Sequence, residues 1–217
     1  MQHENIEVTA VMITRNMERH TYVLMSIRSF LNQTYGASRL LIVNDGNPVG
    51  LDHPRIREVM LPFEAERTLG DLRNIALDHV ETPLVIQWDD DDWSRPDRIA
   101  VQVGAYVPDH AVLLQNQIRC DIRSGEYRSV SYPDGIDGTI LHPANESRYP
   151  SWAKSEDTEF LKSWREVGKT TVVDNEPGVY IRLYTGHNTW HRDHIMWPGQ
   201  KVCRPEELTL LQQDLSK

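Results

Sequence analysis

Residues 83–92 constrain this chain more than any other stretch: they read PLVIQW and run directly into four consecutive aspartates. The apolar part is short and shows no polar alternation, which predicts a strand buried on both faces. Adjacent carboxylates repel one another by about 1 kcal/mol in water and by more near a protein surface. A fold that places four of them at the end of a buried strand must therefore supply a neutralising charge.

Strands and helices alternate through the first half of the chain. The predicted strands are residues 8–13, 39–43, 56–61 and 83–88, and the predicted helices are residues 18–32 and 69–80. This order is typical of right-handed βαβ units and a largely parallel sheet, in which ligands bind beyond the carboxyl ends of the strands. Thr14-Arg15-Asn16, Asn44-Asp45-Gly46 and residues 89–92 follow three strand ends, so we expect them to converge at one edge.

The second half is predicted to mix strands with one further helix. Strand-like stretches at 111–122 and 126–132 flank Arg123-Ser124-Gly125, which is a hairpin pattern. Ser155 precedes a group of acids and an apolar-periodic run, so it is predicted to be a helix N-cap. Further short extended segments are expected at 139–142, 170–173 and 179–184, and a weak amphipathic helix at 206–215.

Composition narrows the classes of function. The chain has 217 residues, 23 of them basic and 32 acidic, and its net charge of −9 argues against wrapping nucleic acid or lying on an anionic membrane. Cys120 and Cys203 are too few for a disulfide framework and are expected to be structural, as in a cytoplasmic protein. The first residues lack the pattern of a secretory signal, and no apolar run is long enough to span a bilayer.

The four aspartates allow two interpretations. Carboxylate oxygens suit Mg²⁺ or Mn²⁺, and in a continued strand Asp89 and Asp91 would share one side. The alternative is a solvated acidic turn that precedes the next helix near Pro96. The buried strand before the run and Trp93 after it favour the metal site.

An ordered set of short motifs accompanies the acids. They are Thr14-Arg15-Asn16, SFLNQTY at 29–35, LIVNDG at 41–46, Leu72-Arg73-Asn74, DDDDW at 89–93, Pro96-Asp97-Arg98-Ile99, Ser155-Glu156-Asp157, Tyr180-Ile181-Arg182 and HNTW at 187–190. Together they resemble glycosyltransferases of family 2, which have the GT-A fold, over about residues 6–194. The run of acids is similar to the DXD motif of that family. Asn44 departs from the family, which has an aspartate there, and Asp90 adds a carboxylate.

The resemblance implies a single α/β domain over residues 1–217, with a Rossmann-like, mixed, mostly parallel sheet flanked by helices. Residues 6–110 would be the nucleotide-sugar-binding half, residues 111–199 the acceptor-binding and catalytic half, and residues 200–217 a tail.

The resemblance also implies roles for the matched residues. Nucleotide binding would fall to Thr14, Arg15, Asn16, Asp45, Arg73, Asp89 and Asp90. Asp91, Asp89 and His187 would hold Mn²⁺ or Mg²⁺. Asp157, helped by Glu156, would be the general base that deprotonates the acceptor hydroxyl.

The implied activity is metal-dependent, inverting transfer of a hexosyl or N-acetylhexosaminyl group from a nucleotide-sugar, expected to be a UDP-sugar. The acceptor would be a saccharide or a lipid-linked saccharide, as in polysaccharide biosynthesis. A cytoplasmic location is expected, and peripheral association with the inner face of the membrane stays open. The alternatives are a non-catalytic nucleotide-sugar-binding protein of the same fold and another phosphate-handling metalloenzyme.

The segment GHNTWHRDH suggests one more alternative. His187 and His191 are four residues apart and His194 follows, so a plain zinc-binding module would rest on these histidines. Gly186 and Asn188 argue against a regular helix there. Trp152, Trp190 and Trp197 could stack on an acceptor sugar, although tryptophans are more often part of a core.

Overall fold

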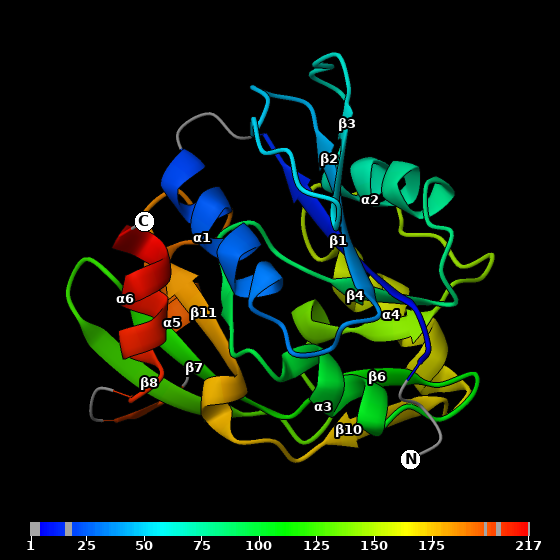
Figure 1. Ribbon diagram of the computed structural model, residues 1–217. Helices are drawn as coiled ribbons and strands as arrows, with labels where there is room; N and C mark the ends of the chain where they lie inside the picture. The colour runs from blue at the N-terminus through cyan, green and yellow to red at the C-terminus, as the bar shows by residue number, and fades with distance from the viewer. Residues whose placement is uncertain (1–4, 16–18, 198, 203–204, 217) are drawn as a thin grey trace.

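The computed structural model describes residues 5–15, 19–197, 199–202 and 205–216, and its larger sheet has seven strands (Figure 1). In spatial order they are β10 (Thr170–Val173), β6 (Ala111–Leu114), β9 (Leu141–Pro143), β4 (Leu84–Gln87), β1 (Val8–Thr14), β2 (Ser38–Asn44) and β3 (Ile56–Met60). Only β9 runs antiparallel to its neighbours in this sheet. The predicted mixed, mostly parallel sheet flanked by helices is confirmed.

Helices cover both faces of the larger sheet. They are α1 (His20–Leu31) and α3 (Arg98–Gly104) on one face, and α2 (Leu69–Asp78) and α4 (Glu156–Glu166) on the other. Successive side chains of β1 point to opposite faces of the sheet, and each face packs against different helices. Met12 packs in one core with Phe30 of α1, whereas Val11 packs in another with Leu72 of α2.

A second sheet of five strands stands beside the first. In spatial order its strands are β12 (Gln200–Lys201), β8 (Glu126–Ser131), β7 (Asn116–Asp121), β11 (Tyr180–Tyr184) and β5 (Trp93–Ser94). Two further helices, α5 (Arg192–Met196) and α6 (Leu208–Ser216), complete the fold. The four aspartates connect β4 of the first sheet to β5 of the second, so both sheets position them.

The last helix is fixed next to the acids. Figure 1 shows α6 lying alongside α1. On α6, the carboxylate of Asp214 accepts hydrogen bonds from Trp93 Nε1 at 3.0 Å and from Asn32 Nδ2 at 3.2 Å. Leu208 and Leu211 pack in the same core as Trp93. The described part of the predicted tail is therefore packed against α1 and the second sheet.

Three details differ from the expectation. The predicted strand 111–122 breaks at Gln115, because the Asn175 carboxamide accepts the backbone N–H groups of Gln115 and Asn116 and the chain passes from one sheet to the other. The extended segment 139–142 begins as a 3-10 turn at Asp137–Thr139. Ser155 precedes α4 with φ of 60°, and its side chain makes no capping hydrogen bond, so the predicted N-cap interaction is wrong.

Cys120 lies in the core of the second sheet, where burial raises the pKa of its thiol to about 12, as suits a structural cysteine. Cys203 lies outside the described residues. Among the helices that the structure describes, none combines the length and the apolar character needed to cross a membrane.

Candidate active site

The ends of three neighbouring strands form one edge of the larger sheet. β1 lies between β4 and β2, with Val11 opposite Gln87 and Thr14 opposite Asn44. A cavity of about 730 Å³ opens there, which we call the donor cavity. Its lining includes Thr14, Arg15, Asp45, Arg73, Asp89, Asp90, Asp91, Glu156, Asp157 and His187. These are all the predicted site residues except Asn16, which lies outside the described residues.

The turn after β2 is held by Asn44. Its Oδ1 accepts from the backbone N–H of Gly46 at 2.8 Å, and its Nδ2 donates to Glu58 Oε1 at 2.7 Å. A Cβ on Gly46 would lie 1.4 Å from the backbone oxygen of Arg15, so only glycine allows the two loops to touch. Asn44 is fully buried and does not line the donor cavity. The replacement of the family's aspartate by Asn44 therefore affects the structure of this turn and does not change the lining of the donor cavity.

Asp45 forms a bidentate ion pair with Arg15. Arg15 Nε and Nη2 lie 3.0 Å from Asp45 Oδ1 and 3.0 Å from Oδ2. The pair raises the pKa of Arg15, and its planar geometry fixes the direction of both groups. The guanidinium also lies 4.7 Å from the ring centroid of Phe63, an aromatic side chain that is 59% exposed. The sequence motifs gave no sign of Phe63.

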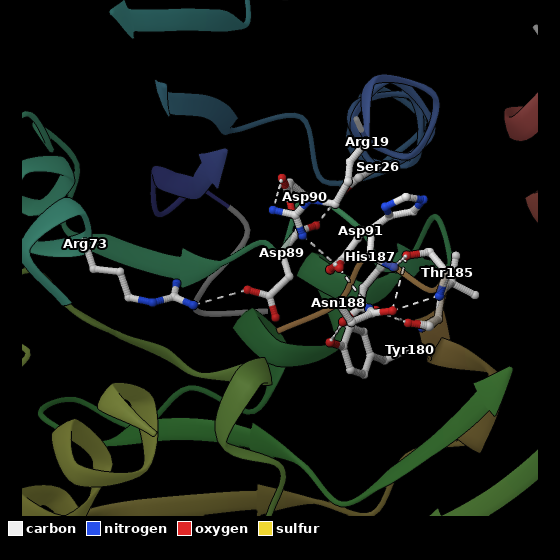
Figure 2. Close-up of polar contacts among 12 residues, drawn as sticks. Arg19, Ser26, Arg73, Asp89, Asp90, Asp91, Tyr180, Thr185, His187 and Asn188 are labelled. Atoms are coloured by element: carbon white, nitrogen blue, oxygen red, sulfur yellow. Dashed lines mark hydrogen bonds and ion pairs between the residues drawn. The ribbon is translucent and has the colours of Figure 1, made fainter. Parts of the chain in front are cut away.

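Asp89 points toward Arg73, whereas Asp90 and Asp91 point toward Arg19 (Figure 2). Asp89 accepts from Gln87 Nε2 at 3.0 Å and from Arg73 Nη2 at 3.3 Å. Asp90 and Asp91 both pair with Arg19, at 3.2 and 3.1 Å. The expected alternation, with Asp89 and Asp91 on one side, is wrong because the chain turns at residues 90–91 instead of continuing as a strand.

Asp92 is an anchor for the second sheet. It accepts hydrogen bonds from the Tyr180 hydroxyl and from the backbone N–H of Leu183, the latter at 2.8 Å. On the other side of the cluster, Asn188 Nδ2 donates to Asp91 Oδ2 at 2.9 Å. Three residues that line the donor cavity were not predicted as site residues: Arg19, Arg182 and Asn188. Arg182 and Asn188 belong to the motifs quoted above. Arg19 was missed because its partners are 71 and 72 residues away in the sequence.

The cluster suits a divalent cation that is only partly held by protein. Burial raises the pKa values of Asp90 and Asp91, and repulsion from a neighbouring aspartate raises them further. Asp90 Oδ2 is buried and accepts no hydrogen bond among the described residues, although Arg19 lies nearby.

In the described part of the chain, no three His, Cys, Asp or Glu side chains are arranged as a ready-made cation site, the predicted set Asp89, Asp91 and His187 included. Mg²⁺ typically takes one or two carboxylates and completes its shell with substrate phosphates, and the residues present fit that pattern.

Arg73 connects Asp89, one of the four aspartates, to Glu156, which precedes the candidate base Asp157. It is buried in the second turn of α2, and this helix begins with a capping box between Thr68 and Asp71. Its Nε donates to Glu156 Oε1 at 2.9 Å, while its Nη2 reaches Asp89. A Cβ on Gly70 would lie 1.8 Å from the backbone oxygen of Pro150, so glycine is needed for α2 to lie this close to the backbone at Pro150.

Asp157 follows Glu156 in the first turn of α4 but has a different environment. Its carboxylate accepts the backbone N–H of Thr158 at 2.8 Å. Burial raises its pKa, Arg73 opposes the shift, and the charge of Glu156 adds to it. A carboxylate with a raised pKa is better matched to taking up a proton near neutral pH.

The three histidines are dispersed. His187 lies on an exposed loop at the donor cavity, and His191 precedes α5. His194 stacks on Trp190, with ring centroids 4.1 Å apart. Trp152 and Trp197 are exposed, so they are not part of the core, whereas Trp190 is half-buried at the cavity wall.

Comparison with solved structures identifies proteins with a similar fold. Residues 1–349 of TarS from S. aureus, in complex with UDP-GlcNAc, align with a TM-score of 0.64 and 15% identity over 97% of this chain and 66% of that one. A mannosyltransferase, PcManGT from Pyrobaculum calidifontis, in complex with GDP-Man and Mn²⁺, aligns with a TM-score of 0.60 and 14% identity over 83% and 57%. The chain thus spans about two thirds or less of these structures. Both are GT-A glycosyltransferases, and the chain has the GT-A fold.

Sequence comparison agrees with the fold. An uncharacterized glycosyltransferase of Haemophilus influenzae is 21% identical over 201 residues, which are 81% of this chain and 79% of that protein. The family model of glycosyl transferase family 2 matches residues 9–192. The matched region contains the strand ends, the four aspartates and the start of α4. The chain belongs to glycosyl transferase family 2.

Proposed function

We propose that this protein transfers a sugar from a nucleotide-sugar donor to an acceptor hydroxyl, with Asp157 as the general base. One observation carries the proposal: Asp157 lies on the wall between the donor cavity and a second cavity of about 510 Å³. A base that reaches both spaces can take a proton from an acceptor in one while the donor occupies the other.

The donor side supports binding of a nucleotide diphosphate. Asp45, held by Arg15, has lone pairs left to accept an imide N–H, as a uracil base offers. Arg73 and Arg19 supply positive charge beside the acids. TarS is in complex with UDP-GlcNAc and PcManGT with GDP-Man and Mn²⁺, which fits a UDP-linked hexose or N-acetylhexosamine as donor.

The chemistry follows from this arrangement. Asp157 removes the proton of the acceptor hydroxyl as its oxygen forms a bond to the anomeric carbon. The bond from that carbon to the phosphate oxygen breaks, and its electrons leave with the nucleoside diphosphate. Attack from the side opposite the leaving group inverts the anomeric configuration. Mn²⁺ or Mg²⁺ held by Asp91, with Asp89 or Asp90 beside it, would supply positive charge for the leaving phosphates.

The acceptor is a saccharide or a lipid-linked saccharide in polysaccharide biosynthesis. Residues 6–110 provide most of the donor cavity and residues 111–199 most of the second cavity, within one domain. We place the protein in the cytoplasm, and peripheral contact with the inner face of the membrane is compatible with a lipid-linked acceptor.

Calorimetric titration with UDP tests the proposal, with GDP and dTDP as controls, first in Mn²⁺ and then in EDTA. Binding that prefers UDP and is lost in EDTA supports a metal-dependent UDP-sugar site. Slow hydrolysis of a UDP-sugar by the same preparation distinguishes an enzyme from a binding protein. Absence of nucleotide binding in Mn²⁺ would overturn the proposal.

A further inference from the structure

The second cavity, which we call the acceptor cavity, is lined by acids and arginines, and two of its arginines, Arg119 and Arg182, form no ion pair with a carboxylate among the described residues. β7 runs along it, and side-chain alternation places Gln117 and Arg119 on the cavity side while Ile118 and Cys120 pack in the core of the second sheet. Arg182 on the neighbouring strand β11 also lines the cavity. The three side chains therefore share one face of this sheet.

Gln117 is the clearest sign that something is bound there. Its side chain is 0% exposed, and neither Nε2 nor Oε1 has a hydrogen-bond partner among the described residues. Burying an amide without partners costs roughly 1–3 kcal/mol by mutational data. Most buried polar groups are paired, so an orphaned amide on a cavity wall points to a ligand as its partner.

Arg119 is oriented by neutral groups. Its Nη1 donates to the backbone oxygen of Trp197 at 3.1 Å and its Nη2 to the Tyr132 hydroxyl at 2.7 Å. Its Nε is buried and has no hydrogen-bond partner in the described part of the chain. No carboxylate forms an ion pair with Arg119 among the described residues, although its side chain is almost fully buried.

Arg182 adds to the positive charge. It is the register partner of Arg119 in the parallel pair of β11 and β7, so two positive charges lie side by side and repel each other. Among the described residues it forms no hydrogen bond or ion pair, although the acids of the donor cavity attract it. The charge of Asp137, also on this wall, is taken up by Arg165 at 2.7 Å. Burial lowers the pKa of His194, and the charges of Arg182 and Arg119 lower it further.

We propose that the acceptor carries an anionic group, a phosphate or a carboxylate, which binds between Gln117 and Arg119 while the acceptor hydroxyl faces Asp157. This inference rests on the proposed function and adds the chemical class of the acceptor. An oxyanion in the cavity would relieve the repulsion between the two arginines, and a shift of the two side chains toward it would let the now buried Arg119 Nε and Gln117 Nε2 donate to it.

The experiment titrates the full chain, saturated with UDP and Mn²⁺, with glucose 6-phosphate, glucuronate and glucose. We expect at least one anionic sugar to bind ten times or more tightly than glucose, and the stronger of the two identifies the group as phosphate or carboxylate. Arg119→Gln should weaken that binding at least tenfold and leave the UDP affinity within twofold. Arg148→Gln is the control, because this exposed arginine pairs with Asp78 away from both cavities.

Gln117→Leu separates binding from folding. Because the buried amide has no protein partner among the described residues, its removal should leave the melting temperature equal or higher while anion affinity falls. Equal affinity for glucose and both anionic sugars, or anion binding unchanged in Arg119→Gln, would overturn the inference alone. Failure of UDP to bind in Mn²⁺ would instead overturn the proposed function and this inference with it.

Discussion

Arg73 and Glu156 form a buried ion pair in which the arginine Nε lies 2.9 Å from the glutamate Oε1. The pair connects the second turn of α2 to the first turn of α4, and the other side of the same guanidinium reaches Asp89. Glu156 thus sets the position of Arg73 and, through it, of one of the four aspartates. Asp157, the adjacent residue, is left to face the two cavities.

Glu156→Gln should lower the free energy of unfolding by about 2 kcal/mol, because it removes the closer of the two carboxylates that pair with a buried guanidinium and leaves only Asp89 at 3.3 Å. Urea denaturation measures the change. Glu159→Gln removes a charge from the same helix turn at a half-buried position, where the side chain is 42% exposed, and should change stability by less than about 0.5 kcal/mol. Equal stability of the Glu156 variant and wild type would contradict the structural importance of the pair.

Asp157→Asn should slow sugar transfer about 10²- to 10⁴-fold, the usual range for loss of a general base. Because the substitution keeps the shape of the side chain, UDP affinity should stay within about twofold of wild type. Hydrolysis of a UDP-sugar and calorimetry on the same preparation measure the two quantities. Wild-type turnover in this variant would show that another group removes the proton.

Asp91→Ala should abolish the Mn²⁺-dependent part of UDP binding, since this carboxylate is the proposed metal ligand. Titration with UDP in Mn²⁺ and in EDTA should then give the same weak affinity. Asp78→Ala, which removes an exposed carboxylate that does not line the donor cavity, should bind UDP like wild type. A normal response of the Asp91 variant to Mn²⁺ would assign the metal to the neighbouring acids.

Arg19→Gln should increase the affinity of the nucleotide-free protein for Mn²⁺ about fivefold. The Arg19 guanidinium pairs with both Asp90 and Asp91, so a cation must compete with it for the same oxygens. A pair of this kind is worth about 1 kcal/mol, which corresponds to that factor. Free Mn²⁺ measured by electron paramagnetic resonance gives the affinity, and weaker binding in the variant would mean that Arg19 assists the metal.

His142 should make stability depend on pH. Burial lowers the pKa of its imidazole from 6.5 to about 4, so between these values the unfolded chain takes up a proton that the folded chain does not. The free energy of unfolding should therefore be level above about pH 6.5 and fall below it. We expect roughly 2 kcal/mol less stability at pH 5 than at pH 7 from this residue.

Comparison with His142→Phe isolates that contribution, because both proteins share every other titrating group. Urea unfolding at pH 7 and pH 5 should show a smaller loss for the variant. The same loss in both proteins would place the acid sensitivity elsewhere.

Most of the larger sheet was predictable because its strands are short apolar runs that end in polar loops, and local pattern is enough to find them. The convergence of Thr14, Asp45 and the four aspartates followed from topology, since adjacent parallel strands end at the same edge. The break at Gln115 was not predictable, because it depends on a carboxamide from Asn175 about 60 residues later.

The direction of each aspartate also escaped prediction. Whether Asp89 shares a side with Asp91 depends on a turn that Arg19, Asn188 and Tyr180 stabilise from three distant parts of the chain. Asp92 belongs to the same acidic run as the candidate metal ligands, yet it accepts hydrogen bonds from Tyr180 and Leu183 of β11. Spacing alone could not separate that anchor from the candidate ligands.

The wall that Asp157 shares with both cavities has a consequence for redesign. The donor cavity is built on the ends of β1, β2 and β4, whereas β7 and β11 carry the cationic face of the acceptor cavity. Exchanging Gln117 and Arg119 for other side chains would alter only the second space. Under the proposed function, replacing these two positions of one strand would change acceptor selectivity, while the donor cavity and Asp157 would stay the same.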